Sequence, residues 1–395
     1  MTRNSIREYA QATLRRYSTA SKREKGIILE EFCKTTGYHR KAAIRLLRHP
    51  CKATHHPRGR PPEYKPELIQ PLKLLWELSG NLCSKLLVPL LPALIAALER
   101  HQELKLPPQV HQQLVQMSPA TVDRLLRPCR HNPLHRPYTQ SRSISALRSQ
   151  VPIRTFGEWQ NVSPGSLQAD LVAHCGETTA GFYLNTLVAV DVATGWVEAE
   201  PVWGKGKQRV GTAVHKLRGC LPFGLRELHT GNGGEFLNEI LYPWCGREGI
   251  HLTRGRAYKK NDQAYAEQKN WSLVRKVVGY DRYTTRAAYE QLKELYQPLR
   301  LHFNFFQPIR KLMAKERVGA KVKKVYDKAR TPYERLLASG VLGKPKEHEL
   351  EQLYLSLNPA QLRREIDGGL ERLWKLADRP QDSKASKRDD GYYLE

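Results

Sequence analysis

Apolar residues along the first 150 positions recur at intervals of three and four, which is the spacing of amphipathic helices. Such stretches occupy residues 22–33, 39–48, 66–78, 83–98 and a short segment that begins at 118. From about residue 151 the pattern changes to short runs of β-branched and aromatic residues, which are typical of strands. The chain is therefore predicted to be helical in its front part and to contain a sheet behind it.

The strand-rich part begins with neighbouring strands and continues with an alternation. Strands at 166–172, 182–190 and 196–202 are joined by Gly-containing turns, which indicates an antiparallel meander. A second series follows, with helices at 207–217 and 237–247, strands at 225–230 and 250–253, and a long helix from 261. This order predicts an α/β fold in which a mixed sheet is flanked by helices.

Two short helices near the front have the layout of a helix-turn-helix. Ser21 is placed to cap the helix at 22–33, and Gly37 ends it. The second helix carries Lys41, Arg45 and Arg48 along one side, as expected of a helix that enters a major groove. A helical hairpin with a solvated basic face is the alternative.

The charge of the chain favours the first interpretation. The 395 residues include 65 Lys and Arg against 39 Asp and Glu, a formal net charge of +26. Residues 1–60 hold 15 basic and 4 acidic residues, a net of +11. Basic residues release counterions when they neutralise phosphates, so a polyanion such as double-stranded DNA is the expected partner.

Composition excludes several other classes. A hydrophobic fraction of 40% is that of a globular chain rather than one disordered throughout. The longest apolar stretch, 86–98, contains prolines and is shorter than the roughly 18 residues that a membrane helix needs. Charged residues within 1–16 are unlike a signal peptide, and seven scattered cysteines are typical of a reducing compartment. We expect a cytoplasmic, nucleoid-associated protein without a membrane partner.

Candidate acidic ligands lie on the predicted strands and helices, near their ends. Asp170 lies on the first strand, in QADLVAHCG at 168–176. Glu267 lies on the long helix, in NDQAYAEQKN at 261–270. Between them the strand at 225–230 continues into HTGNGGEF at 229–236. This last segment is where a third acidic ligand is sought.

With these segments, residues 166–337 resemble the catalytic core of bacterial insertion-sequence transposases of the retroviral-integrase type. The resemblance continues in NFFQP at 304–308, KVKKVYD at 321–327 and TPYERLL at 331–337. It implies a ribonuclease-H-like fold with an Asp-Asp-Glu triad that binds two Mg²⁺ or Mn²⁺ ions. It also implies strand nicking and strand transfer, with element ends and target DNA as partners of a homo-oligomer.

The resemblance assigns Asp170 and Glu267 as catalytic residues and metal ligands, and it places Gly231 where the second Asp belongs. Sixty residues separate Asp170 from Gly231, and 35 separate Gly231 from Glu267, a spacing known in the family. Glycine has no side chain to bind a metal, so we expect a weakened two-ion site and impaired catalysis. Asn232, Glu235 and Asp262 are alternative ligands; the family layout makes Asp262 a helix cap.

The sequence also predicts a division into five regions. These are a helix-turn-helix region at 1–57, a linker and second helical DNA-binding region at 58–150, an integrase-like core at 151–305, a basic segment and C-terminal helices at 306–378, and a disordered tail at 379–395.

Other basic groups are candidates for DNA contacts. Lys259, Lys260 and Lys269 flank the presumed active site and are predicted to bind phosphates, with a solvated helix face as the alternative. The densely basic segment 310–330 suits a DNA-tracking surface. His and Cys residues at 49–56 are close enough to suggest zinc, but their spacing is not that of a standard finger, and a basic loop is favoured.

Two functions remain open at this stage. One is a DNA-integrating enzyme that acts as a multimer. The other is a non-catalytic DNA-binding protein or repressor derived from such an enzyme. An RNA-processing nuclease on the same fold is less favoured, because the front of the chain is predicted to be a helix-turn-helix.

Overall fold

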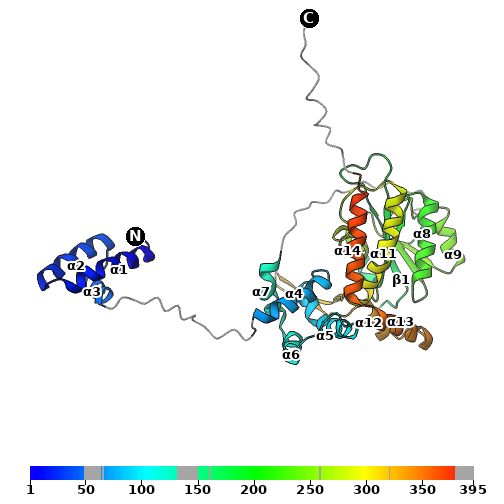
Figure 1. Ribbon diagram of the computed structural model, residues 1–395. Coiled ribbons are helices and arrows are strands. Elements are labelled where there is room, and N and C mark those ends of the chain that lie inside the picture. The colour runs from blue at the N-terminus through cyan, green and yellow to red at the C-terminus, as the bar shows by residue number, and fades with distance from the viewer. Residues whose placement is uncertain are drawn as a thin grey trace, which may run out of the picture. The chain divides into compact units, whose positions relative to one another are not determined.

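A computed structural model describes residues 1–48, 64, 66–130, 150–159, 162–257, 259–319 and 321–378. The chain divides into two compact units, Met1–Glu63 and Tyr64–Glu395, here called the N-terminal unit and the main unit. Figure 1 shows the elements of each.

The N-terminal unit contains the helices α1 (Arg3–Thr19), α2 (Lys22–Thr36) and α3 (Arg40–Arg48). Ser21 and Glu24 form a reciprocal capping box at the start of α2, and Gly37 ends it with a φ of 72°. The helices enclose a small core around Phe32, which is fully buried. The two predicted helices are confirmed, and α1 is an additional helix that contributes Ile6, Ala10 and Tyr17 to the core.

The main unit is built on a five-stranded mixed sheet with the order β3-β2-β1-β4-β5. Its strands are β1 (Ser166–Ala173), β2 (Asn185–Asp191), β3 (Val197–Val202), β4 (Glu227–Thr230) and β5 (His251–Arg254). The first three strands are antiparallel neighbours, whereas β4 runs parallel to both β1 and β5. The predicted α/β class, the meander and the later strands are confirmed.

Helices cover both faces of this sheet (Figure 1). On one face α8 (Lys207–Cys220) and α9 (Leu241–Arg247) pack on Leu167 and Ala169 of β1. On the other, α10 (Ala264–Lys269), α11 (Arg286–Phe306) and α14 (Pro359–Lys375) enclose a second core with Val172 and Val188. Side chains of a strand alternate between faces, so consecutive residues of β1 serve different cores.

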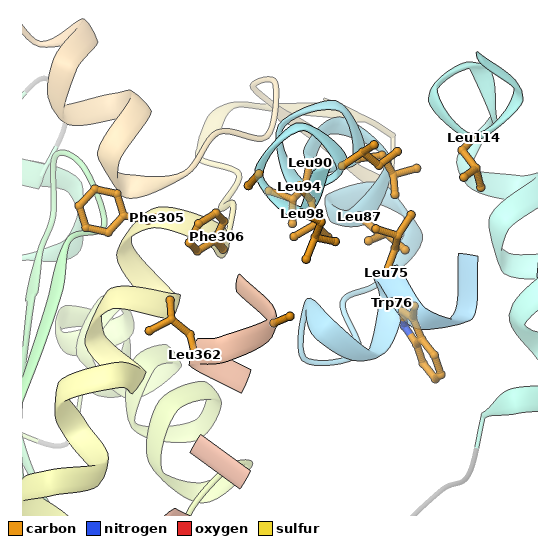
Figure 2. Packing of buried hydrophobic residues seen from close by; sticks show 14 of the residues in the cluster. Leu75, Trp76, Leu87, Leu90, Leu94, Leu98, Leu114, Phe305, Phe306 and Leu362 are labelled. Carbon is orange, nitrogen blue, oxygen red and sulfur yellow. The ribbon is translucent and has the colours of Figure 1, made fainter. Parts of the chain in front are cut away.

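The helices before the sheet belong to the same unit as the sheet. They are η1 (Pro66–Leu68), α4 (Ile69–Leu78), α5 (Ser84–Arg100), α6 (Pro108–Gln116), α7 (Pro119–Leu126) and η2 (Arg127–Cys129). Their leucines share one hydrophobic core with Phe305, Phe306 and Leu362 (Figure 2). The sequence predicts a separate helical region at 58–150. Its described residues belong to the main unit, because their apolar faces are buried against the C-terminal elements.

Two departures from the predicted elements lie after β5. The expected long helix from 261 starts as a 3-10 turn, η5 (Lys260–Gln263), continues as α10 and ends in the π-helical segment η6 (Asn270–Arg275). The basic segment forms a hairpin of β6 (Leu312–Val318) and β7 (Lys321–Tyr326). The remaining elements are η4 (Phe156–Trp159), α12 (Pro332–Ala338) and α13 (Lys344–Ser356).

The helices of the described residues are all too short or too polar to cross a membrane. The predicted linker and zinc candidates at 49–62 and the tail at 379–395 lie outside the described residues.

Replacing the fully buried Phe32 by alanine should destabilise the N-terminal unit by about 3–5 kcal/mol, because it removes the ring that α1, α2 and α3 share. Calorimetry should show the loss or a large downward shift of one unfolding transition while that of the main unit stays unchanged. The control Ile27→Ala, at a side chain that is 62% exposed on the same helix, should change little. A shift of both transitions by Phe32→Ala would contradict the division into two units.

Candidate active site at the end of β1

Strand β1 directs alternate side chains into the space under α10. Leu167 and Ala169 belong to the core with α8 and α9, so Gln168 and Asp170 face the opposite side, with Val172. Gln168 is fully buried, whereas Asp170 is partly exposed. The strand thus presents one structural amide and one carboxylate to the same helix.

Gln168 fixes α10 to the sheet through its side-chain amide. Its Oε1 accepts hydrogen bonds from the backbone N–H groups of Tyr265 and Ala266, at 3.1 and 3.2 Å. Its Nε2 donates to the carbonyl of Asp262 at 3.0 Å. The first N–H groups of a helix have no partner within the helix, so this side chain satisfies two of them. The helix that carries Glu267 is therefore placed by a residue two positions before Asp170.

Asn270 links the two predicted acidic ligands. Its Nδ2 donates to Oδ2 of Asp170 at 2.9 Å. Asn270 follows Glu267 by three residues, about one helical turn, so both side chains lie on the side of the helix that faces β1. The structure thereby joins Asp170 to the end of the helix that carries Glu267. Gln168 and Asn270 were not identified from the sequence; a glutamine in an otherwise apolar strand is the only signal for the first.

Gly231 follows the strand that pairs with β1. The parallel register pairs Leu167 with Leu228 and Gln168 with His229, where the pairing of the two strands ends; the same register continued by two residues would set Gly231 against Asp170. Gly231 is buried and comes directly after the last residue of β4. Its φ lies outside the left-handed region, so the backbone itself accepts a side chain. An acidic side chain here would share the face of Asp170.

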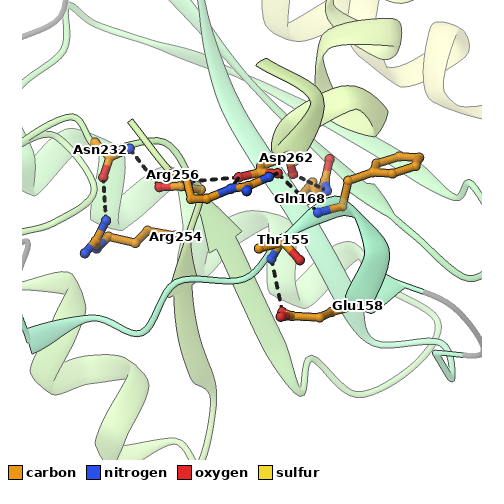
Figure 3. A network of polar contacts seen from close by, with 9 residues as sticks. Thr155, Glu158, Gln168, Asn232, Arg254, Arg256 and Asp262 are labelled. Atoms are coloured by element: carbon orange, nitrogen blue, oxygen red, sulfur yellow. Dashed lines mark hydrogen bonds and ion pairs between the residues drawn. The ribbon is translucent and has the colours of Figure 1, made fainter. Parts of the chain in front are cut away.

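The alternative ligands near Gly231 are committed elsewhere. Asn232 donates from Nδ2 to the carbonyl of Gly255 at 2.9 Å, and its Oδ1 accepts from Nη1 of Arg254 at 3.1 Å (Figure 3). The carboxylate of Glu235 folds back against Gly233, where it fills the space that a Cβ would need. Neither side chain replaces the missing acid in this conformation.

Asp262 forms a buried ion pair rather than the predicted helix cap. Its carboxylate accepts from Nε and Nη2 of Arg256 at 2.8 and 2.9 Å, and from the backbone N–H groups of Arg256 and Phe156 at 3.0 and 3.2 Å (Figure 3). The hydrogen bonds from Arg256 lower the pKa of Asp262 to about 2. The residue ties η4, η5 and the loop after β5 together, and the N-cap position of α10 is Gln263 instead.

The predicted phosphate contacts differ in exposure. Lys259 is exposed, and so are Lys41, Arg45 and Arg48 on α3. The side chain of Lys260 lies outside the described part of the chain. Lys269 is not the surface residue that the sequence predicts, because its side chain is buried with Nζ 5.4 Å from the ring centroid of Phe303. Burial lowers its pKa to about 8, which also reduces its charge as a phosphate ligand.

The oxygen atoms near Asp170 that could bind a metal ion determine which cation fits the site. Among the described residues there is no group of three or more His, Cys, Asp or Glu side chains that could hold a metal ion. Asn270 adds an amide oxygen, since its Oδ1 is buried without a hydrogen-bond partner in the described part of the chain. Two carboxylates and an amide oxygen suit a hard divalent cation such as Mg²⁺, with one negative charge fewer than an Asp-Asp-Glu triad supplies.

Asp262→Asn should lower the free energy of unfolding of the main unit by about 1–2 kcal/mol, because the buried carboxylate loses its charge while the half-exposed guanidinium of Arg256 keeps its own. The low pKa of Asp262 stabilises the fold above its ordinary pKa near 3.8, and that stability is lost as the pH falls toward 2. Chemical denaturation at pH 7 and in steps from pH 4 downward should show this pH-dependent part of the free energy of unfolding in the parent protein. The Asp262→Asn variant should lack it.

The same substitution at an exposed ion pair is a matched control. Asp123 pairs with Arg130, and both side chains are nearly half exposed, so Asp123→Asn should cost no more than about 1 kcal/mol. Equal losses from the two substitutions would show that the Asp262 pair has no special structural role.

Comparison with known proteins shows a strong similarity to a bacterial protein. The chain is 42% identical over 324 residues to "Uncharacterized protein y4rM" of Sinorhizobium fredii (strain NBRC 101917 / NGR234). The matched part spans 81% of this chain and 91% of the relative, so it includes most of both proteins. No protein-family model matches the chain. The chain belongs to the same family as y4rM.

Proposed function

We propose that the protein is a double-stranded DNA-binding protein of the transposase and integrase type, with impaired strand nicking and strand transfer. The mixed sheet with helices on both faces is compatible with the ribonuclease-H-like fold that the resemblance implies. The single observation that supports the site is the hydrogen bond from Asn270 to Asp170, which joins β1 to the end of the helix of Glu267.

Each residue has a definite task in this proposal. Asp170 and Glu267 are the ligands that hold a divalent cation, and Asn270 orients the carboxylate of Asp170. Gln168 keeps α10 at a fixed distance from β1 and so sets where Glu267 points. The cation, when bound, supplies activation of a water or 3′-hydroxyl and stabilises the leaving oxygen at phosphorus. Without a carboxylate at position 231, the site holds such ions less tightly.

The same glycine supports the second function, a non-catalytic DNA-binding protein or repressor that competes for element ends. Binding needs only the basic surface, and the charge of +26 is unaffected by the loss of one acidic ligand. The α3 helix offers its exposed basic side for this purpose, as the second helix of a helix-turn-helix. The two functions therefore differ only in whether chemistry follows binding.

Gly231→Asp should raise Mg²⁺- or Mn²⁺-dependent nicking of DNA that contains the repeats flanking the gene by at least about 100-fold, because it restores a charged ligand. Calorimetric titration with Mn²⁺ should show tighter binding, which is a readout independent of activity. Gly231→Asn is the matched control of similar size without charge, and it should gain little. Robust nicking by the parent protein that is abolished by Asp170→Asn would contradict impairment and leave a fully active enzyme.

Neutralising the basic side of α3 by Lys41→Gln, Arg45→Gln and Arg48→Gln should weaken binding to duplex DNA. Each phosphate contact that is lost reduces the slope of log K against log salt by roughly 0.9. Fluorescence anisotropy with labelled duplex at several salt concentrations measures both quantities. The control carries Lys22→Gln, Arg23→Gln and Lys34→Gln, which remove the same charge from exposed positions of α2.

A larger loss of affinity for the α3 variant supports the helix-turn-helix. Equal losses in both variants would mean that only the total charge of the N-terminal unit matters, which contradicts a recognition helix. Preference for duplex RNA in the same assay would favour a nuclease that acts on RNA instead.

A further inference from the structure

The hairpin of β6 and β7 has two faces with different charge. Lys315 lies directly opposite Lys324, and the next pair on that face is Arg317 opposite Val322. On the other face Glu316 lies opposite Lys323, and their charged groups are 3.5 Å apart. This face therefore contains an ion pair. The other, here called the basic face, is defined by Lys315, Arg317 and Lys324.

The basic face is costly for the hairpin itself. Like charges directly opposite each other destabilise a pair of strands, so the pairing of Lys315 with Lys324 does not stabilise the fold. All three basic side chains are exposed, as is Val322 at 53%. A two-stranded ribbon is only marginally stable by itself, which makes the repulsion harder to tolerate. An anion placed along this face would remove the repulsion.

The base of the hairpin is held firmly on the sheet. Ile309 and Arg330 form a β-bridge, and Asp327 accepts hydrogen bonds from the backbone N–H of Lys311 at 2.6 Å and the guanidinium of Arg335 at 2.7 Å. Nζ of Lys311 donates to the carbonyl of Ala193 in the turn between β2 and β3. The basic face is therefore presented by an anchored arm, which lowers the entropy cost of binding.

The basic face is connected to the helix of Glu267 through two aromatic rings. Nζ of Lys315 lies 5.7 Å from the ring centroid of Phe156. Phe156 stacks on Tyr265, with ring centroids 6.1 Å apart. Tyr265 precedes Glu267 by two residues on α10, so the two side chains leave the helix on different sides. A duplex laid along the hairpin is thus led to the helix that carries Glu267.

We propose that the basic face of the β6 and β7 hairpin holds the duplex DNA that enters the Asp170 and Glu267 site, with Lys315, Arg317 and Lys324 as contacts to successive phosphates. The major groove of B-DNA is wide enough to admit a two-stranded ribbon. This inference rests on the proposed function. It gives the DNA that reaches the site a contact on the hairpin, in addition to the proposed contact with α3.

The experiment uses the full chain with Lys315→Gln, Arg317→Gln and Lys324→Gln. Anisotropy with labelled duplex should show at least a tenfold loss of affinity near 0.1 M salt and a salt slope smaller by roughly 2–3. The matched control carries Lys293→Gln, Lys344→Gln and Lys375→Gln, which remove the same charge from exposed positions on α11, α13 and α14. Circular dichroism and thermal unfolding establish that both variants fold, and removal of the lysine repulsion should leave the hairpin variant at least as stable as the parent.

The outcomes separate the two proposals. Loss of affinity and slope in the hairpin variant, with the control close to the parent, supports the inference. Parent-like binding by the hairpin variant overturns the hairpin contact and leaves the proposed DNA binding standing. Absence of duplex binding by the parent protein overturns both. If the hairpin variant fails to fold, a chain with benzoylphenylalanine at position 322 replaces it. The control carries the same group at Leu355. If duplex DNA crosslinks at neither position, the inference is overturned.

Discussion

The buried amide of Gln168 is the interaction on which the candidate site depends. Its oxygen satisfies two N–H groups at the start of α10, and its nitrogen satisfies a carbonyl of η5. A fully buried amide that lost these partners would cost about 1–3 kcal/mol for each unsatisfied group, so the position of the helix is strongly constrained. Glu267 lies on the first turns of this helix, and its distance from Asp170 on β1 follows from that constraint.

Further contacts extend this rigid unit in two directions. Through Asp262, the η5 turn is bound to Arg256 after β5 and to the backbone of η4. Through Asn270, the far end of α10 is bound to Asp170 itself. The helices α11 and α14 pack behind α10 and close the core beneath it. A site held from the strand, the turn and the helix suits ligands that must keep a fixed geometry, which is what metal-assisted phosphoryl transfer requires.

Gly231 is the reason why both a catalytic and a non-catalytic function are proposed for this framework. Gly231 follows β4, which pairs in parallel with β1 as far as Gln168 and His229, and it has no side chain to present. The nearby polar residues do not compensate, because Asn232 and Asp262 are bound to arginines and to backbone groups. The proposed site therefore rests on two acids and one amide. Within the main unit, Lys259 and the hairpin add exposed basic groups, which the proposed binding of DNA would use.

Local patterns in the sequence determined the strands, most helices and the segments that carry Asp170, Gly231 and Glu267, because periodicity and turn residues act over a few neighbouring positions. The role of Gln168, the burial of Lys269 and the ion pair of Asp262 were decided only by the tertiary structure, since each depends on groups from distant parts of the chain. The hairpin shows the same division. Its basic composition is visible in the sequence, but only the strand register places Lys315 opposite Lys324 and balances Glu316 with Lys323.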